Sequence, residues 1–340
     1  MDTPGKPAKT GLKILIIRFS SIGDIVLTTP VVRCLKQQLP GVELHYLTKR
    51  SFAGILRYNP YITKTILLDS SWELMMHSLR LEAYDYVIDL HHNLRTLRIK
   101  RGLGAKSFAY NKLNVQKWLL VNFKINNMPP VHIVDRYMDT VRALGVVNDG
   151  KGLDYFIPEK DQVPLEDIPA AQSLGYIGVV IGAALNTKKL PVEKLRELCE
   201  KIDYPIILLG GPEDREAGSI IAEADPIKIY NSCGKFNLNE SADLVRTARL
   251  VITHDTGLMH IAAAFGKPII SVWGNTVPQF GMTPYYGFSA SVSHMMEVKG
   301  LSCRPCSKIG YAKCPRGHFK CMNNHDIDEL AKRAMALVRR

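Results

Sequence analysis

The chain has 340 residues, 46% of them hydrophobic and 22% charged, which is enough for about two domains that each bury a core. Its longest uncharged apolar run, residues 173–185, is well short of the ~20 residues that span a bilayer, which excludes a transmembrane helix there. The net charge of +12 favours anionic partners, but the basic residues are dispersed, so we expect no nucleic acid partner.

The N-terminal stretch and the cysteine content both indicate a cytoplasmic protein. Residues 1–11, MDTPGKPAKTG, are polar and lack the apolar stretch and cleavage site of a secretory signal. The seven cysteines, an odd number in a chain of this length, do not resemble a disulfide scaffold.

The first part of the chain alternates between strand and helix patterns. A buried-strand run at residues 13–19, KILIIRF, precedes apolar residues at helical spacing in 24–41. Further strands are predicted at 42–47, 63–69 and 84–90. This rhythm predicts a largely parallel sheet with helices on both faces.

The same rhythm restarts after residues 158–172, a proline-rich and acidic stretch that we interpret as a linker. Strands are predicted at 175–183, 205–211, 227–231, 249–254 and 267–274, and helices at 191–202, 213–224, 237–248 and 256–266. We therefore expect two α/β domains, 1–165 and 173–325, and a C-terminal helix at 326–340 that packs back on the first domain.

The loop after the first strand ends in a lone carboxylate, Asp24, within ILIIRFSSIGDIVLTTPVV, residues 14–32. One interpretation is a helix cap, because Asp is a preferred capping residue. The other is chemistry, because ligands of open α/β sheets bind beyond the carboxyl ends of the strands. The sequence of this loop alone does not decide between the capping and the catalytic interpretation of Asp24.

The stretch RLVITHDTGLMHIAAAFGKPIISVWG, residues 249–274, predicts a strand, a tight turn and a helix. Free N–H groups around Thr256, Gly257 and Leu258 would suit a diphosphate at the helix N-terminus. The alternative is that Asp255 or Thr256 is a plain N-cap and that His260 packs on the flank of the helix.

Two further loops follow strands of the same domain. Thr187 and Lys188 come after 175–183, where a lysine can neutralise the charge of a departing phosphate. Glu213, in LLGGPED, could hold ribose hydroxyls, although a simple Gly-Pro turn explains this loop equally well. The chain lacks a P-loop motif and a G-x-G-x-x-G after its first strand, which argues against P-loop hydrolysis and dinucleotide-dependent oxidation.

Taken together, RFSSIGDIVLTTPVV, NTKKLP, GGPED and HDTGLMHIAAAFGKPIISVWG resemble glycosyltransferase family 9, the ADP-heptose:lipopolysaccharide heptosyltransferases, from about residue 12 to residue 325. The resemblance implies a GT-B fold, in which two Rossmann-like domains with mostly parallel sheets face a central cleft. It also implies inverting transfer of heptose from ADP-heptose, bound by the C-terminal domain, to the lipopolysaccharide inner core, bound by the N-terminal domain. No cofactor and no catalytic metal are expected. The basic excess would then hold the enzyme at the cytoplasmic membrane face.

The resemblance also assigns roles to residues. Asp24 matches the catalytic aspartate, the base, and Lys188 the phosphate-binding lysine that assists catalysis. The family's donor site maps onto Thr187, Glu213, Asp255, Thr256, Gly257, Leu258, Met259 and His260. Its acceptor site maps onto Ser20, Ser21, Gly23, Asn93 and Arg95; for residues 89–93 the alternative is strand termination and helix capping. Leu190 stands where the family commonly has Trp.

Two alternatives to heptose transfer remain open from the sequence. The chain could be a related inverting glycosyltransferase with another nucleotide sugar or glycan acceptor, or a non-catalytic module that binds sugar nucleotides. Separately, Cys303, Cys306, Cys314 and Cys321, with His318 among them, are compatible with a structural zinc site or with reduced thiols.

Overall fold

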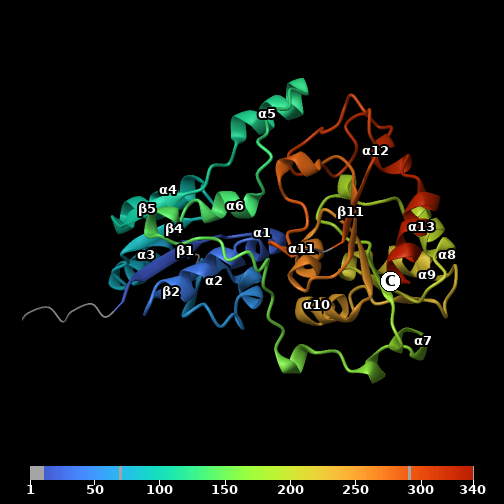
Figure 1. The fold of residues 1–340 in the computed structure, drawn as a ribbon, viewed down its shortest axis with the longest axis horizontal. Helices are drawn as coiled ribbons and strands as arrows, with labels where there is room; N and C mark the ends of the chain where they lie inside the picture. The colour runs from blue at the N-terminus through green and yellow to red at the C-terminus, as the bar shows by residue number, and fades with distance from the viewer. Residues whose placement is uncertain (1–10, 69–70, 290–291, 340) are drawn as a thin grey trace, which may run out of the picture. The chain divides into compact units, whose positions relative to one another are not determined.

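The computed structural model describes residues 11–68, 71–289 and 292–339, and the chain divides into two compact units (Figure 1). Unit 1 comprises Met1–Lys112 and Val134–Asp149, and unit 2 comprises Leu113–Ile133 and Gly150–Arg340. Residues 1–10 of the polar N-terminal stretch and the last residue of the strand predicted at 63–69 lie outside the described residues.

The described residues of unit 1 form a five-stranded parallel sheet in the order β3-β2-β1-β4-β5. At its centre lies β1 (Lys13–Ile17), where Ile14 is opposite Leu44 on one side and Tyr86 on the other. A parallel strand covered on both faces needs a continuous apolar run, and KILII provides one. The other strands are β2 (Glu43–Lys49), β3 (Lys64–Leu68), β4 (Tyr86–Asp89) and β5 (Lys106–Ala109).

One face of this sheet is covered by α3 (Trp72–Leu81) and α4 (Leu94–Leu103). Leu15 and Ile17 of β1 share a buried cluster with Met76 of α3 and Ile99 of α4. The remaining helical segments are α1 (Ile22–Val26), α2 (Thr29–Gln38), η1 (Arg50–Ile55), α6 (Ile133–Met138) and η2 (Arg142–Leu144).

Unit 2 has a six-stranded parallel sheet in its described residues, in the order β11-β10-β9-β6-β7-β8. The strands are β6 (Ile177–Val180), β7 (Ile206–Leu209), β8 (Ile229–Asn231), β9 (Leu250–His254), β10 (Ile269–Trp273) and β11 (Ser293–Glu297). The longer helices are α5 (Asn114–Phe123), α8 (Val192–Lys201), α9 (Arg215–Ala222), α10 (Leu238–Thr247), α11 (Gly257–Ala264) and α13 (Ile327–Val338). The shorter segments are η3 (Glu159–Asp161), η4 (Leu165–Asp167), α7 (Ala170–Ser173), η5 (Asn186–Lys188), η6 (Pro212–Asp214), η7 (Pro278–Phe280) and α12 (Lys320–Asn323).

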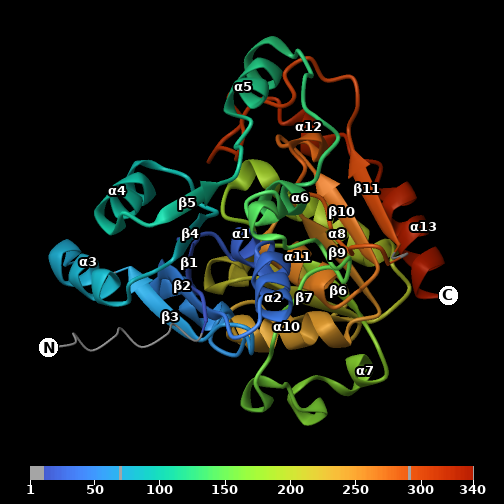
Figure 2. The same cartoon turned by 60° about the vertical axis from the view of Figure 1, so that its left-hand side comes forward.

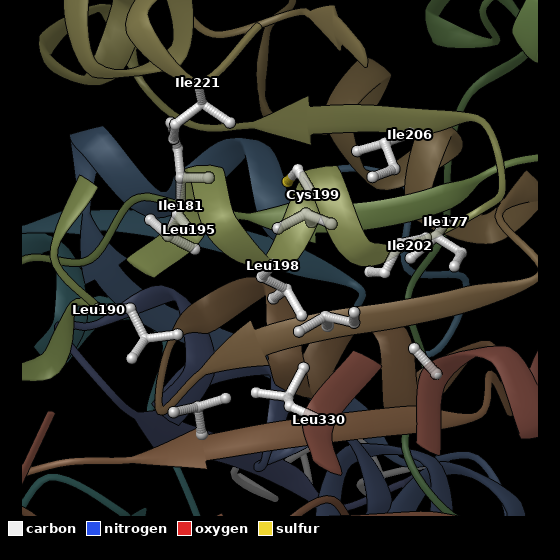
Figure 3. Packing of buried hydrophobic residues seen from close by; sticks show 14 of the residues in the cluster. Ile177, Ile181, Leu190, Leu195, Leu198, Cys199, Ile202, Ile206, Ile221 and Leu330 are labelled. Carbon is white, nitrogen blue, oxygen red and sulfur yellow. The ribbon is translucent and has the colours of Figure 1, made fainter. Parts of the chain in front are cut away.

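One buried hydrophobic cluster of unit 2 lies between its sheet and α8, α9 and α13. Figure 3 shows Ile177 and Ile206 of the strands packed with Leu198 of α8 and Leu330 of α13. Leu190, just before α8, belongs to the same buried cluster. The residue in place of the family's usual Trp therefore packs in the core.

Two parallel-sheet α/β units confirm the predicted fold class, but three details differ from the sequence predictions. The helix predicted at 24–41 is two helices, because Pro30 lies in the first turn of α2 and cannot continue α1. Unit 2 begins at Gly150 and also takes Leu113–Ile133, whereas the sequence placed a boundary at 165. The C-terminal helix α13, predicted to pack back on the first domain, belongs to unit 2, where it packs against α8 and β9 with Leu330, Ala331 and Ala334 buried.

In the part of the chain that the structure describes, no helix combines the length and the apolar content that crossing a membrane requires.

Candidate functional site

Each sheet has a point where the strand order reverses. In unit 1 the chain runs from β1 through β2 to β3 and then returns to place β4 on the other side of β1. In unit 2 it runs from β6 through β7 to β8 and then places β9 on the other side of β6. Ligands of open α/β sheets bind beyond the carboxyl ends of the strands at such points. The loops after β1, β4, β6 and β9 are therefore the candidates in each unit.

Asp24 lies in the first turn of α1, directly after β1. Its Oδ1 is 2.6 Å from Nη2 of Arg18, and its Oδ2 accepts hydrogen bonds from the Ser21 amide (3.1 Å) and the Ser21 hydroxyl (2.7 Å). The side chain is 20% exposed. Asp24 therefore does support the start of the helix, with Ser21 as the N-cap, and its carboxylate still reaches the surface.

Arg18 is the buried cation that positions Asp24. Its Nη1 donates to the Leu90 carbonyl (2.6 Å) and lies 3.0 Å from the Tyr137 hydroxyl, while its Nε donates to the Ser20 carbonyl (2.7 Å). Burial alone would lower the pKa of Arg18, but Tyr137 and Asp24 outweigh it and raise that pKa. A permanently charged guanidinium thus ties the loops after β1 and β4 together at the reversal point.

His91 packs beside this pair in the loop after β4. Its ring lies 4.7 Å from the ring of Phe19. Burial, followed by the charges of Arg18 and Lys112, lowers the pKa of His91 to about 4. The imidazole is therefore neutral at pH 7 and adds no positive charge next to Arg18.

The predicted acceptor residues lie on these same two loops. Ser20, Ser21 and Gly23 precede Asp24, whereas Asn93 begins α4 and Arg95 is exposed in its first turn. The Asn93 side chain accepts the Thr96 amide (2.9 Å) and the Asn93 amide donates to the Thr96 hydroxyl (2.9 Å), so the capping interpretation accounts for Asn93. Contact of these residues with an acceptor stays a prediction.

In unit 2 the structure brings Lys188 and Asp255 together from the loops after β6 and β9. Lys188 Nζ lies 2.7 Å from Asp255 Oδ2 and 3.2 Å from the Asp255 carbonyl oxygen. The Thr276 hydroxyl also donates to Asp255 Oδ2 (3.0 Å). Lys188 is thus held at the start of α11, whose N-cap is Thr256.

The first turn of α11 presents the backbone amides that the sequence predicted. Thr256, Gly257 and Leu258 are partly exposed, and the amides at such a helix start have no partner within the helix. Together with the helix dipole they favour an anion. The side chains of Met259 and His260 are buried. Among the residues predicted to contact the donor in this helix, the partly exposed ones are therefore those of its first turn.

Thr187 holds the loop that carries Lys188 in place. Its hydroxyl accepts the Tyr311 amide (2.7 Å) and donates to the Tyr311 carbonyl (3.0 Å), and the side chain is buried. The hydroxyl therefore anchors the Lys188 loop to residue 311. Contact of Thr187 with a donor nucleotide stays a prediction.

The neighbouring loop after β7 supports the Lys188 loop through Asp214. Asp214 is buried and lies 2.6 Å from Lys189 Nζ, while Glu213 beside it is exposed. Gly182 is required here, because a Cβ on it would lie 2.2 Å from Asp214 Oδ2. The predicted contact of Glu213 with ribose stays a prediction.

His254, at the end of β9, supports the same loop from below the surface. Its Nε2 accepts the Leu190 amide (2.9 Å), so the neutral ring carries its proton on Nδ1. Burial, then His325 and Lys189, lowers the pKa of His254 to about 3. The hydrogen bond that fixes Leu190 thus depends on a neutral imidazole.

His254→Gln is expected to flatten the pH dependence of stability. In the unfolded chain this histidine binds a proton below about pH 6.5, whereas the folded protein does not until about pH 3, so acidification favours unfolding by up to about 1.4 kcal/mol per pH unit. Glutamine can still accept the Leu190 amide and does not titrate. Urea unfolding between pH 7 and pH 4 measures the difference, with exposed His77→Gln as control. If the free energy of unfolding changed with pH equally in His254→Gln and in wild type, a buried neutral His254 would be contradicted.

The cysteines of the C-terminal stretch are free thiols, as are all seven in the chain. Cys303 Sγ lies 3.7 Å from His318 Nε2. Burial first, then the neighbouring Cys306 and Cys314, raises the pKa of Cys321 to about 11, so its thiol is protonated at neutral pH. Among the described residues, no three His, Cys, Asp or Glu side chains are arranged to hold a metal ion, and zinc binding by these cysteines stays untested.

Sequence reasoning did not identify Arg18, His91, Lys189 or Asp214 as parts of these loops. Arg18 could have been identified as a candidate from the sequence, because it is a charged residue that directly follows the buried run KILII. The partners of the other three depend on which strands are neighbours, and the sequence does not specify the strand order.

A model of glycosyltransferase family 9 (heptosyltransferase) matches residues 72–312. Lipooligosaccharide heptosyltransferase 2 of Haemophilus influenzae is 28% identical over 344 residues, covering 88% of this chain and 93% of the relative.

Two solved structures share the fold. One is a glycosyl transferase family 9 protein from Veillonella parvula (TM-score 0.74, 23% identity), covering 96% of this chain and 97% of that one. The other is the E. coli ADP-heptose lps heptosyltransferase II (TM-score 0.72, 19% identity), covering 96% of this chain and 98% of that one. These likenesses confirm the predicted GT-B class.

Proposed function

The chain belongs to glycosyltransferase family 9, and we propose that it transfers heptose from ADP-heptose to the inner core of lipopolysaccharide. The observation that carries the proposal is the meeting of Lys188, Asp255 and the start of α11 at the reversal point of the unit 2 sheet. The similarity to heptosyltransferases supports heptose as the sugar and ADP as its carrier.

Unit 2 supplies the groups that stabilise the leaving diphosphate. The amides of Thr256, Gly257 and Leu258 face the β-phosphate side of the donor, and Lys188 exchanges its contact with Asp255 for a phosphate oxygen. As the bond between the anomeric carbon and the phosphate oxygen breaks, negative charge grows on ADP. A lysine and a helix N-terminus in fixed positions stabilise that charge without a metal ion.

Unit 1 supplies the base. The acceptor hydroxyl attacks the anomeric carbon from the face opposite the diphosphate, and its proton passes to the Asp24 carboxylate. The new bond joins the acceptor oxygen to the anomeric carbon, so the configuration inverts in one displacement. Arg18 acts as a positioning residue, because its contacts with Ser20 and Leu90 fix the direction in which Asp24 points.

The acceptor defines where the enzyme works. The lipopolysaccharide inner core is attached to lipid A, so we place transfer at the cytoplasmic face of the membrane, with Ser20, Ser21, Gly23, Asn93 and Arg95 toward the acceptor. The net charge of +12 supports attraction to this anionic lipid.

Incubation with a panel of nucleotide sugars tests the proposal. We expect product from ADP-heptose with lipid A bearing Kdo, or with a heptosylated core, detected as the mass increase of one heptose. UDP-glucose and GDP-mannose should give little product. Transfer from either of these, with none from ADP-heptose, would instead support the related glycosyltransferase, and binding without transfer from any donor would support the non-catalytic module.

A further inference from the structure

We infer that α5 and the loop at residues 303–319 of unit 2 form a surface that docks onto an anionic lipid bilayer. We refer to it as the docking surface. The inference rests on the proposed function, because a lipid-anchored acceptor requires the enzyme to work at a membrane. It concerns residues outside the candidate site.

The helix α5 is apolar on two faces. On one, Leu120 is buried with Val277 and Phe280 of unit 2. On the other, Val115 and Trp118 are exposed one turn apart, and Trp118 is 50% exposed. Phe123, at the end of the helix, is 58% exposed, and its ring lies 5.0 Å from that of Trp118. One face of α5 thus packs on the rest of unit 2 through Leu120, and the other exposes aromatic rings to solvent.

The end of α5 is joined to the loop that precedes α12. Lys124 Nζ donates to the Pro305 carbonyl (2.7 Å) as well as to the Val121 carbonyl (2.6 Å). Figures 1 and 2 both show α5 beside this loop, and Figure 2 shows it away from the strands β9 to β11. The loop adds exposed Ile309 and Tyr311 to the apolar part of the docking surface.

The two stretches of the chain that include the docking surface carry basic and no acidic residues. Residues 113–133 contain Lys117 and Lys124 but neither Asp nor Glu, although acidic residues make up 32 of the 340. Residues 298–325 also contain neither Asp nor Glu, and their exposed cations include Lys308, Lys313 and Arg316. This charge is complementary to lipid phosphates, and each such cation near an anionic leaflet strengthens binding.

The combination of residues favours a bilayer over a protein partner. Trp and Phe place their rings at the headgroup level, while lysines extend their ammonium groups toward the phosphates. Interfaces between proteins are instead depleted of lysine at their centres. Exposed aromatic side chains together with exposed lysines are therefore typical of a lipid-facing surface.

Vesicle co-sedimentation of the full chain tests the inference. Wild type should bind phosphatidylglycerol vesicles and bind phosphatidylcholine vesicles much less. Trp118→Ser/Phe123→Ser and Lys308→Glu/Lys313→Glu should each bind the anionic vesicles about tenfold more weakly. The matched controls Leu174→Ser, at a residue 90% exposed in unit 2, and Lys160→Glu/Lys332→Glu should bind like wild type.

Two outcomes would overturn the inference. The first is equal vesicle binding by wild type and the docking variants. The second is a wild-type dimer in sedimentation velocity that the Trp118→Ser/Phe123→Ser change dissociates while vesicle binding persists, which would assign the surface to a second copy of the chain.

Assays with two acceptors separate this inference from the proposed function. The docking variants should keep wild-type transfer to a water-soluble, deacylated acceptor and lose transfer to the same glycan in vesicles. If wild type transfers heptose to neither acceptor, the proposed function fails, while vesicle binding that depends on Trp118 and Lys308 would still support the docking surface.

Discussion

Asp24→Asn is expected to lower kcat for transfer by about 10²–10⁴-fold, the usual contribution of a general base. Asparagine keeps one oxygen, which can accept either from Arg18 or from Ser21 but not from both, so the variant retains only part of the local contacts of Asp24. Its amide cannot take the proton of the acceptor hydroxyl. ADP binding should be unchanged, because the nucleotide is assigned to unit 2. Initial rates with ADP-heptose and a soluble acceptor, together with calorimetric titration of ADP, measure both effects.

Asp149→Asn is the matched control for this change. Arg33 lies 2.8 Å from Asp149 within unit 1, and this pair is about as buried as the pair of Arg18 and Asp24. Loss of the carboxylate at either position removes the partner of a buried arginine, so the two variants should lose similar melting temperature. Only Asp24→Asn should lose turnover. Near-normal transfer by a folded Asp24→Asn protein, or an equal loss in Asp149→Asn, would contradict the base assignment.

The central strands of both sheets could be predicted from the sequence. Parallel strands buried on both faces need continuous apolar runs, and the runs around Ile14 and Ile252 have no other explanation in a chain of this composition. The division of the helix at Thr28 was predictable in principle, because Pro30 removes an amide that a continuous helix would use. The sequence analysis nevertheless predicted one continuous helix, because the apolar residues keep helical spacing on both sides of the break.

The assignment of Leu113–Ile133 to unit 2 could not be read from the sequence. It depends on packing of Leu120 against Val277 and Phe280, residues more than 150 positions later. The C-terminal helix is a similar case, because its apolar face would suit either unit. Such contacts depend on the tertiary arrangement, and no local pattern specifies them.

The candidate site was partly predictable for a topological reason. Lys188 and Asp255 follow strands, and loops at the carboxyl ends of parallel strands share one edge of the sheet. Their direct contact requires β6 and β9 to be neighbours, which only the strand order shows. The same limit applies to Arg18, whose bond to Leu90 exists because β1 and β4 are adjacent.

Lys188→Ala is expected to weaken ADP binding by about 10–100-fold, the loss of one charge-assisted hydrogen bond to a phosphate. The change also leaves the Asp255 carboxylate next to the diphosphate without its lysine, and this repulsion adds to the loss. The fall in kcat should be larger still, about 10²–10³-fold, because charge on the leaving group is greatest in the transition state. Calorimetric titration of ADP and single-turnover rates at saturating ADP-heptose separate the two effects.

Lys189→Ala distinguishes loss of this ammonium group from damage to the loop. Lys189 forms an ion pair of the same kind one residue away, but its partner is the buried Asp214. Its removal should lower the melting temperature, because a buried carboxylate loses its cation. ADP binding should nevertheless stay within a few-fold of wild type, since Lys189 pairs with Asp214 whereas Lys188 pairs with Asp255 at the start of α11. Equal loss of ADP binding in both variants would show that the loop as a whole, and not Lys188, determines affinity for the diphosphate.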